Sequence, residues 1–464
     1  MSDEKELFFI INWLDFVDNQ SFTYKKKDLS PYFKELFCRL LLKGMRDNNL
    51  RADGHYTYYD YCKKIEGSEL KETETKALVK ELQWHLLGNK TDYRYLLVAE
   101  ILYTLETLGF SITEDFEKTL KEELSFSDNK FARCLELIKK PVIIKKKRIK
   151  ASFAQYIEFI KGLEAYNALP VKHIGVCACM SAGKSSFVNA LLGYNILPAR
   201  NEATTAKITS VYDKDGAVKL IGFAQRWNNI CDVNNNLNPQ IIESWNGDKE
   251  ITHIYLQGDM DNIKNDGLVV AVHDTPGVNY SGNSSHHEIT MKFFQNNKMD
   301  LIIYVANVNY IGTSDEKKFL TELLDKVIRT DKTPVIVAFN KVDTIDLEKK
   351  DSLVDSISKI KTDLSNIGFS MKNVEVLPVS SKAAGLFKMA KNGHSKHFTA
   401  KEKKAFAQSL FEFNNLYNFG SEIMKPTTGK GILVGDTEYS VSEIEKALEH
   451  SGLPNIERFI EKVL

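Results

Sequence analysis

The sequence predicts an α/β domain with a doubly wound, mostly parallel β-sheet, preceded by an all-α N-terminal domain. Apolar runs typical of buried strands occur at residues 173–179, 268–273, 301–308, 335–339 and 374–379. They alternate with segments of helical periodicity, which is the order of elements in doubly wound sheets. Further strand-like runs at 208–212, 217–223 and 251–256 predict that this sheet is enlarged.

The segment Ala178-Cys-Met-Ser-Ala-Gly-Lys-Ser185 joins the first strand to a helical pattern. It fits the phosphate-binding loop G-x-x-x-x-G-K-[ST], with alanine in place of the first glycine. Such a turn aims several backbone N–H groups at one point, where the helix dipole also favours an anion. We expect Lys184 to bridge the β- and γ-phosphates and Ser185 to ligate Mg²⁺. The nucleotide-binding residues of this loop are Ala182, Gly183, Lys184, Ser185 and Ser186.

The lysine of this loop has a simple expected role. On the sequence alone, the Lys184 charge is needed only when phosphate is present. Its loss should therefore abolish binding or turnover and leave the fold intact.

A second motif, Asp274-Thr-Pro-Gly277, follows the apolar run 268–272. Ligands bind α/β sheets at the carboxyl ends of strands, so Asp274 lies where it can hold Mg²⁺ through a water. We expect the Gly277 N–H to donate to the γ-phosphate. An Asp-x-x-Gly turn is common by itself. It indicates nucleotide binding only in combination with the other motifs of this chain.

The base is predicted by Asn340-Lys-Val-Asp343, which ends the strand 335–339. The Asp343 carboxylate accepts hydrogen bonds from the N1–H and 2-amino group of guanine, whereas adenine offers neither and would leave a buried acceptor unpaired. The Lys341 stem can lie over the base. A third segment, Ser380-Ser-Lys382, follows the strand 374–379, and we expect the Ser381 N–H to face the guanine oxygen. The residues assigned to the base are Asn340, Lys341, Asp343, Ser380, Ser381 and Lys382.

The residue after Gly277 is unusual for a GTPase. Ras-like enzymes place a glutamine there to orient the attacking water, but this chain has Val278. The water must therefore be held by other groups. Ser181, inside the phosphate-binding loop, is the polar candidate near the bond that breaks.

As a set, these motifs resemble the dynamin superfamily, and within it the bacterial dynamin-like branch, over residues 150–464. The residues that carry the resemblance are Met180-Ser-Ala-Gly-Lys-Ser-Ser186, Asn189-Ala-Leu-Leu-Gly193, Ile196-Leu-Pro198, Ala203-Thr-Thr-Ala206, Asp274-Thr-Pro-Gly277 and Ser451-Gly-Leu-Pro454.

The resemblance implies further roles. Ser181 matches the loop serine that contacts the bridging oxygen and helps to hold a monovalent cation, K⁺ or Na⁺. Thr205, in Thr204-Thr205, matches the threonine that binds Mg²⁺ and positions the water. The implied catalytic residues are thus Ser181, Lys184, Thr205 and Gly277, and the implied metal ligands are Ser185, Thr205 and Asp274. The family also implies a nucleotide-dependent homodimer through the GTPase domain.

We predict a helical domain over residues 1–149 and a GTPase domain with flanking neck helices over 150–464. The basic run Lys145-Lys-Lys-Arg148 is interpreted as the end of a linker, with contact to anionic lipid or nucleic-acid phosphates as the alternatives. The apolar segment Phe8–Val17 lacks the basic polar face of a membrane-surface helix and is predicted to be buried. No stalk of the dynamin type is recognisable after the neck. We expect that the N-terminal helices replace it, that a partner protein supplies it, or that the chain is a truncated product.

Lys+Arg and Asp+Glu both number 62, so no net charge attracts nucleic acid or anionic membrane. The acidic N-terminus does not resemble a signal peptide, and no apolar run has the length of a membrane span. These features predict a protein that is cytoplasmic or peripheral to a membrane.

The motifs together predict an enzyme that hydrolyses GTP to GDP and phosphate and couples nucleotide state to self-association. Two alternatives stay open. One is a nucleotide-switched scaffold with slow hydrolysis that binds a protein partner, including a DNA-replication factor. The other is a Ras-like or ribosome-associated GTPase, which predicts an RNA-binding appendage that the sequence does not show.

Overall fold

The computed structural model describes residues 4–5, 7–9, 11–12, 40, 91–107, 111–124, 127–139, 147–198, 207–227, 229–264, 266–278, 284–310, 312–329, 332–345, 353–422 and 429–464. The chain divides into two compact units. Unit 1 comprises Met1–Leu169 with Ile221–Asn235, and unit 2 comprises Pro170–Leu220 with Asn236–Leu464.

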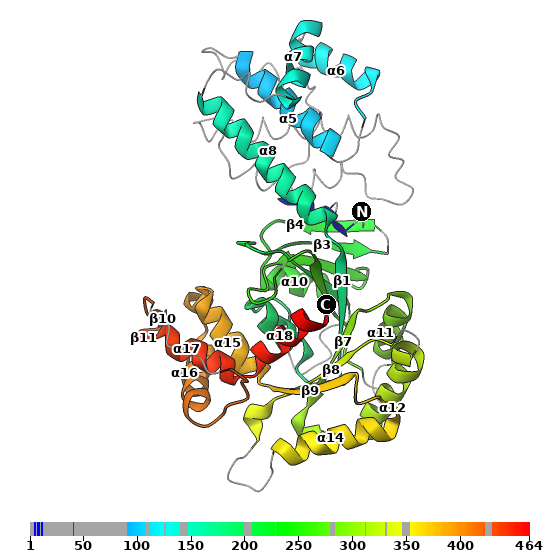
Figure 1. Cartoon of the computed structure of the whole chain (residues 1–464), viewed down its shortest axis with the longest axis vertical. Coiled ribbons are helices and arrows are strands. Elements are labelled where there is room, and N and C mark those ends of the chain that lie inside the picture. The colour runs from blue at the N-terminus through cyan, green and yellow to red at the C-terminus, as the bar shows by residue number, and fades with distance from the viewer. Residues whose placement is uncertain are drawn as a thin grey trace. The chain divides into compact units, whose positions relative to one another are not determined.

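Unit 1 is mainly helical in its described part (Figure 1). Its elements are α5 (Thr91–Thr107), α6 (Glu114–Leu124), α7 (Asp128–Lys139), α8 (Lys147–Ala168) and the antiparallel strands β3 (Ile221–Arg226) and β4 (Asn229–Asn234). The predicted apolar stripe of α5 is buried, as Val98, Ile101, Leu102 and Leu105 show. From the N-terminal apolar segment, Phe8, Phe9 and Ile11 are also buried, and the Phe8 ring contacts Phe223 at a centroid distance of 5.4 Å.

The division of the chain differs from the predicted boundary at residues 149 and 150. One continuous helix, α8, runs through that point, and its residues Tyr156 and Ile160 are buried within unit 1. The predicted neck helix before the GTPase core therefore belongs to the first unit. Of the basic run, Lys147 and Arg148 begin this helix, while residues 145 and 146 lie outside the described chain.

Unit 2 contains a mostly parallel sheet with the strand order β5-β2-β6-β1-β7-β8-β9. Strand β2 is antiparallel to β6, and the pairs β2–β5, β1–β6, β1–β7, β7–β8 and β8–β9 are parallel. The strands are β1 (Val171–Cys177), β2 (Ile208–Asp213), β5 (His253–Gly258), β6 (Val269–Asp274), β7 (Leu301–Asn307), β8 (Val335–Asn340) and β9 (Val374–Val379). The doubly wound α/β prediction is confirmed.

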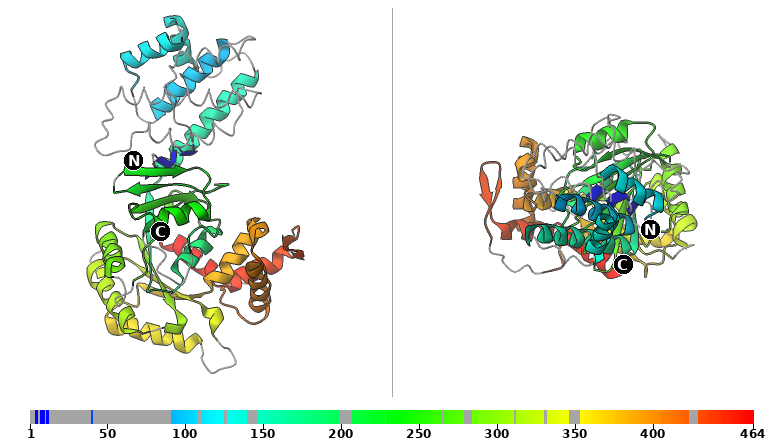
Figure 2. Two further views of the ribbon diagram at one scale, coloured as in Figure 1. Left: turned by 180° about the vertical axis from the view of Figure 1, so that it is seen from behind. Right: turned by 90° about the horizontal axis from the view of Figure 1, so that it is seen from above.

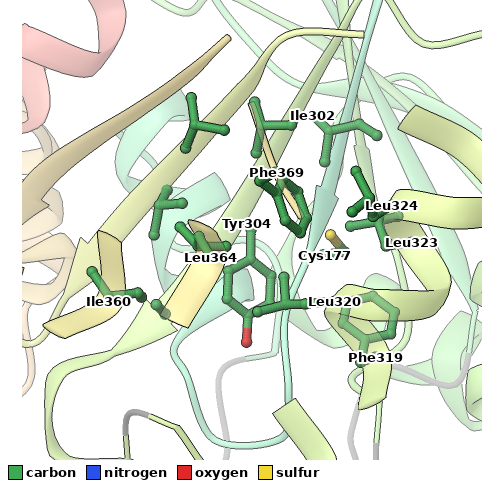
Figure 3. Packing of buried hydrophobic residues seen from close by; sticks show 14 of the residues in the cluster. Cys177, Ile302, Tyr304, Phe319, Leu320, Leu323, Leu324, Ile360, Leu364 and Phe369 are labelled. Carbon is green, nitrogen blue, oxygen red and sulfur yellow. The ribbon is translucent and has the colours of Figure 1, made fainter. Parts of the chain in front are cut away.

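Alternate residues of the central strands face opposite layers of helices. Ile302, Tyr304 and Ala306 of β7 enter the hydrophobic cluster formed with α11 (Ser284–Asn296), α12 (Ser314–Leu323) and α14 (Leu353–Ile367), as Figure 3 shows for several of its members. The opposite layer contains α9 (Lys184–Leu192), α15 (Ser381–Lys391) and α18 (Leu453–Val463). A buried pair fixes this second layer, because Lys388 Nζ lies 2.7 Å from Glu457 Oε1 and donates to the Leu191 carbonyl.

The remaining elements of unit 2 are α10 (Pro239–Gly247), α16 (Ala400–Asn415), α17 (Val441–His450), β10 (Ile432–Val434) and β11 (Thr437–Tyr439). Helices α15, α16 and α17 pack side by side, and the β10–β11 hairpin lies at their outer end (Figure 2). In the described part of the chain, no helix combines the length and apolar character that crossing a bilayer requires.

Candidate nucleotide-binding site

The predicted motifs meet at one edge of the sheet. Strands β1, β6, β8 and β9 are parallel, so their carboxyl ends lie together. Asp274 is paired in register with Val176 of β1, and Asn340 with Val379 of β9. These pairs lie 98 and 39 positions apart in the sequence, and the loops that follow the four strands form one site.

The phosphate-binding loop leads into α9, whose first residue is Lys184. The residue before the helix, Gly183, has φ of 92°, a left-handed conformation that favours glycine. A Cβ atom at Gly183 would also collide with the side-chain amide of Asn340. The loop thus curls tightly around the start of the helix, and this brings its backbone N–H groups to the helix N-terminus as a phosphate site requires.

Three predicted phosphate and metal residues are in direct contact. Lys184 Nζ forms a salt bridge with Asp274 Oδ1, and Ser185 Oγ donates to Asp274 Oδ2 at 3.1 Å. The Lys184 side chain is 6% exposed and that of Asp274 is 1% exposed. Each charge is therefore compensated by the other within a site that excludes most water.

This contact corrects the expectation that Lys184 acts only on phosphate. Removing the lysine would leave the Asp274 carboxylate buried and without its cation, which is strongly destabilising. Lys184 consequently has a structural role in addition to the phosphate-binding role predicted from the sequence.

The oxygen atoms at this point suit a magnesium ion. A serine hydroxyl and a carboxylate are hard ligands of the kind that Mg²⁺ takes in nucleotide sites, where it also keeps waters and binds phosphate oxygens. Ser185 Oγ and Asp274 Oδ2 already lie within 3.1 Å of each other. The third predicted ligand, Thr205, lies outside the described residues, as does Thr204.

The segment after Asp274 is tied to the strands and the phosphate-binding loop. Thr275 Oγ1 donates to the Val176 carbonyl at 2.9 Å. The Val278 N–H donates to the Ala178 carbonyl at 3.0 Å, and the Met180 N–H donates to the Val278 carbonyl at 3.1 Å. The Val278 side chain is 2% exposed and belongs to the hydrophobic core. A buried side chain of this kind cannot orient water, in agreement with the sequence-based argument.

Helix α11 lies behind this segment. Thr290 Oγ1 donates to the Pro276 carbonyl at 3.0 Å, and the His286 ring forms a hydrogen bond with the Gly277 backbone. Burial lowers the pKa of His286, the nearby Lys184 charge lowers it further, and the bond to Gly277 opposes both. The sequence predicts no catalytic or metal-binding role for either residue, because their only signal is a spacing of four residues in a helix that follows the motif.

At the base end, Asn340 connects three loops. Its Nδ2 donates to the Ala182 carbonyl at 2.8 Å, and its Oδ1 accepts from the Ser381 N–H at 3.0 Å. Asn340 is 2% exposed. The Ser381 N–H, expected at the guanine oxygen, is thus engaged with Asn340, whereas the Lys382 N–H has no partner within the described chain.

Lys341 and Asp343 follow Asn340 on a turn that leaves both side chains partly exposed. Lys341 has φ of 67°, and its Nζ donates to the Ser181 carbonyl at 2.7 Å. The amide of Asn307, at the end of β7, also donates to Ser181, at 3.4 Å. The base motif and the phosphate-binding loop are therefore joined twice over, through Ala182 and through Ser181.

Two supporting contacts were not predicted from the sequence. The Tyr417 hydroxyl donates to the carbonyls of Asp343 and Ile345, each at 3.3 Å. The Ser451 carbonyl accepts from the Ser380 N–H at 2.9 Å, so the segment before α18 contacts the loop that follows β9. Both contacts depend on pairs of residues that are more than 70 positions apart, and no local pattern encodes them.

Comparison with known proteins finds similarity over the part of the chain that contains these motifs. The sequence model of the Dynamin family matches residues 174–342. An uncharacterised protein from the xynA 3' region of Caldicellulosiruptor sp. (strain Rt8B.4) is 25% identical over 212 residues, which are 45% of this chain and 49% of that protein. The chain thus spans about half the length of this curated relative.

Two solved structures align with this chain at low identity. A chain of an oligomerised bacterial dynamin pair aligns at 19% identity and a TM-score of 0.35, covering 88% of this chain and 74% of that chain. Toc33 from Arabidopsis thaliana, in complex with GDP and Mg²⁺, aligns at 12% identity and a TM-score of 0.30, covering 68% and 91%.

The fold and the assembled motifs define a P-loop GTPase. The matched segment contains Lys184, Asp274 and Asn340. Over these residues the chain is similar to the Dynamin family.

Proposed function

We propose that this protein binds GTP with Mg²⁺ at the edge of the sheet, hydrolyses it to GDP and phosphate, and couples this cycle to self-association. The observation that carries the proposal is the contact of Lys184, Ser185 and Asp274 at one buried point. Asn340 joins that point to the base motif through Ala182. A triphosphate and its base thus have matching groups on connected loops.

At the phosphate end, Lys184 supplies a cation for the β- and γ-phosphates and the loop supplies backbone donors. Ser185 and Thr205 would ligate Mg²⁺, and Asp274 would hold it through a water. The ion supplies charge that stabilises the leaving phosphate oxygens. Ser181 and Thr205, rather than a glutamine, would hold the attacking water, with K⁺ or Na⁺ beside Ser181.

At the base end, Asp343 would read guanine, with Lys341 over the ring and the segment Ser380–Lys382 facing the guanine oxygen. Hydrogen bonds to a charged acceptor contribute roughly 1.5–3 kcal/mol each. Two such bonds separate guanine from adenine by on the order of a hundredfold or more, since 1.4 kcal/mol is a factor of ten.

The base assignment is tested by Asp343→Asn. The variant should bind GTP about a hundredfold more weakly or worse and prefer xanthosine triphosphate, because an amide complements the 2-oxo group. Titration of both nucleotides and of ATP against wild type and variant measures this. Equal affinity of the wild-type protein for ATP and GTP would show that the base assignment is wrong.

Self-association is supported by the similarity of residues 174–342 to the Dynamin family. In the proposed cycle two GTPase domains associate when GTP is bound. The rival function is a scaffold whose hydrolysis is only a slow reset.

Turnover per molecule separates these two functions. It should rise with protein concentration, and a GTP transition-state mimic should double the mass measured by light scattering. A rate that is independent of concentration, together with a constant mass, would favour the scaffold.

A further inference from the structure

The two peptide groups on either side of Gly277 are held almost completely by the protein. The Pro276 carbonyl accepts from Thr290, the Gly277 backbone is bonded to His286, and the Val278 N–H donates to Ala178. Among the described residues, the Gly277 N–H has no acceptor. One donor is therefore left for a ligand at the place where a γ-phosphate is expected.

The orientation of that donor follows from the Thr290 contact. A trans peptide is planar, and its C=O and N–H point in opposite directions. All described peptide bonds are trans. Thr290 Oγ1 holds the Pro276 oxygen on the α11 side at 3.0 Å. The N–H of the same peptide, which is that of Gly277, consequently points away from α11.

Helix α11 is itself fixed relative to the phosphate-binding loop. Phe294, one turn beyond Thr290, lies against Gly175 of β1 so closely that a Cβ atom there would collide with its ring. Thr290 is 0% exposed, Phe294 is 2% exposed, and His286 is 7% exposed. The strand that leads into the loop and the helix that holds Gly277 therefore form one packed unit.

None of the described residues requires glycine at position 277. Its φ lies outside the left-handed region. A Cβ atom would meet Met180 at 3.7 Å, which is ordinary van der Waals contact. The absence of a side chain is thus explained by close approach of something outside the chain, such as a phosphate oxygen.

We propose that Thr290 and His286, one helical turn apart on α11, are positioning residues that aim the Gly277 N–H at the γ-phosphate. This inference rests on the proposed function. A donor at that place distinguishes GTP from GDP, because GDP has no γ-phosphate. The α11 face would then set how strongly the site prefers the triphosphate and how well it stabilises the transition state.

The test compares Thr290→Val, which keeps the shape and removes the donor, with Thr290→Ser, which keeps the donor. Thr290→Val should bind a non-hydrolysable GTP analogue at least tenfold more weakly, bind GDP within twofold of wild type, and lose turnover. Thr290→Ser should restore the ratio of the two affinities. His286→Ala is a second, independent variant, and it should lower the same ratio by a smaller factor.

A purely structural role predicts a different pattern. If Thr290→Val and His286→Ala lower GDP and GTP-analogue affinity equally, or leave both unchanged, the inference is overturned while GTP binding stands. If Thr290→Val fails to fold, His286→Ala alone decides by the same ratio. Failure of the wild-type protein to bind guanine nucleotides would overturn the proposed function and this inference together.

Discussion

The two ends of the nucleotide site are stabilised by different physics. At the phosphate end, Lys184 and Asp274 are opposite charges that compensate each other in a buried contact. At the base end, Asn340 connects neutral backbone groups of Ala182 and Ser381. The first arrangement depends on charge and the second on hydrogen-bond geometry.

The difference indicates how each end receives its ligand. A phosphate would give Lys184 a new anion, and Mg²⁺ would give Asp274 a new cation, so the pair can separate without leaving a bare charge. The base end needs no such exchange, because the Asn340 amide already fixes its loops. We therefore expect rearrangement on binding at the phosphate end and a preformed surface at the base end.

The largest effect should come from Lys184→Ala. Breaking a buried ion pair by removing one partner costs about 3–5 kcal/mol. The variant should therefore lose GTP turnover and also unfold at lower denaturant concentration without nucleotide. The double variant Lys184→Ala/Asp274→Asn should regain stability but not turnover. If Lys184→Ala alone were as stable as the wild-type protein, Lys184 would not be needed to compensate the buried charge of Asp274.

Asp213, at the end of β2, shows what burial does to a carboxylate in a different setting. Burial, with a contribution from Asp215 and Asp259, raises its pKa from 3.8 to about 7, although the Met260 N–H and Lys264 oppose this. The folded protein then holds more protons than the unfolded chain between those two pH values. Stability should fall as pH rises from about 4 to about 7 and stay low above it.

Asp213→Asn removes the free-energy cost of burying an ionised carboxylate at this position. The variant should gain up to about 4 kcal/mol at pH 8, as an upper limit, and show a flatter stability profile below pH 7. Denaturant unfolding from pH 4 to 8 measures this, with the exposed Asp266→Asn as the control. If Asp213→Asn and Asp266→Asn had the same dependence of stability on pH, burial would not destabilise the Asp213 carboxylate. The contrast with Asp274, whose charge is compensated by Lys184, would then be wrong.

A smaller effect is expected at the base end from Asn340→Ala. It leaves the Ala182 carbonyl and the Ser381 N–H without partners in a buried place, which costs roughly 2–4 kcal/mol in total. Because this asparagine joins both ends, affinity for GDP and for GTP should fall together. Asn415→Ala, which removes one exposed hydrogen bond on α16, should change stability by less than about 0.5 kcal/mol.

The smallest effect is expected from Tyr417→Phe. The hydroxyl makes two long bonds, each 3.3 Å, to the carbonyls of Asp343 and Ile345. Losing them should cost less than about 1 kcal/mol and weaken guanine binding less than tenfold. A larger loss, measured by nucleotide titration, would show that the base end is not preformed and that Tyr417 holds it in place.

The strands were predictable because most of them are runs of mainly apolar residues. The run 335–339 became β8 (Val335–Asn340), and 374–379 became β9 with the same bounds. The shift of one predicted strand, 217–223, to β3 (Ile221–Arg226) reflects the weaker pattern of a run interrupted by Lys219. The predicted domain boundary between residues 149 and 150 does not coincide with the end of an element, because α8 continues through it as an unbroken helix.

The sequence by itself determined the α/β class, the order of the strands along the chain, and the residue types at the ends of four of them. These follow from local periodicity and from motifs whose spacing is set by one turn. Only the tertiary structure decided that Lys184 faces Asp274, that Asn340 joins Ala182 to Ser381, and that Thr290 holds the Pro276 carbonyl. Apart from Thr290 and Pro276, these contacts join residues at least 41 positions apart. They exist because parallel strands align their carboxyl ends, which no local pattern can encode.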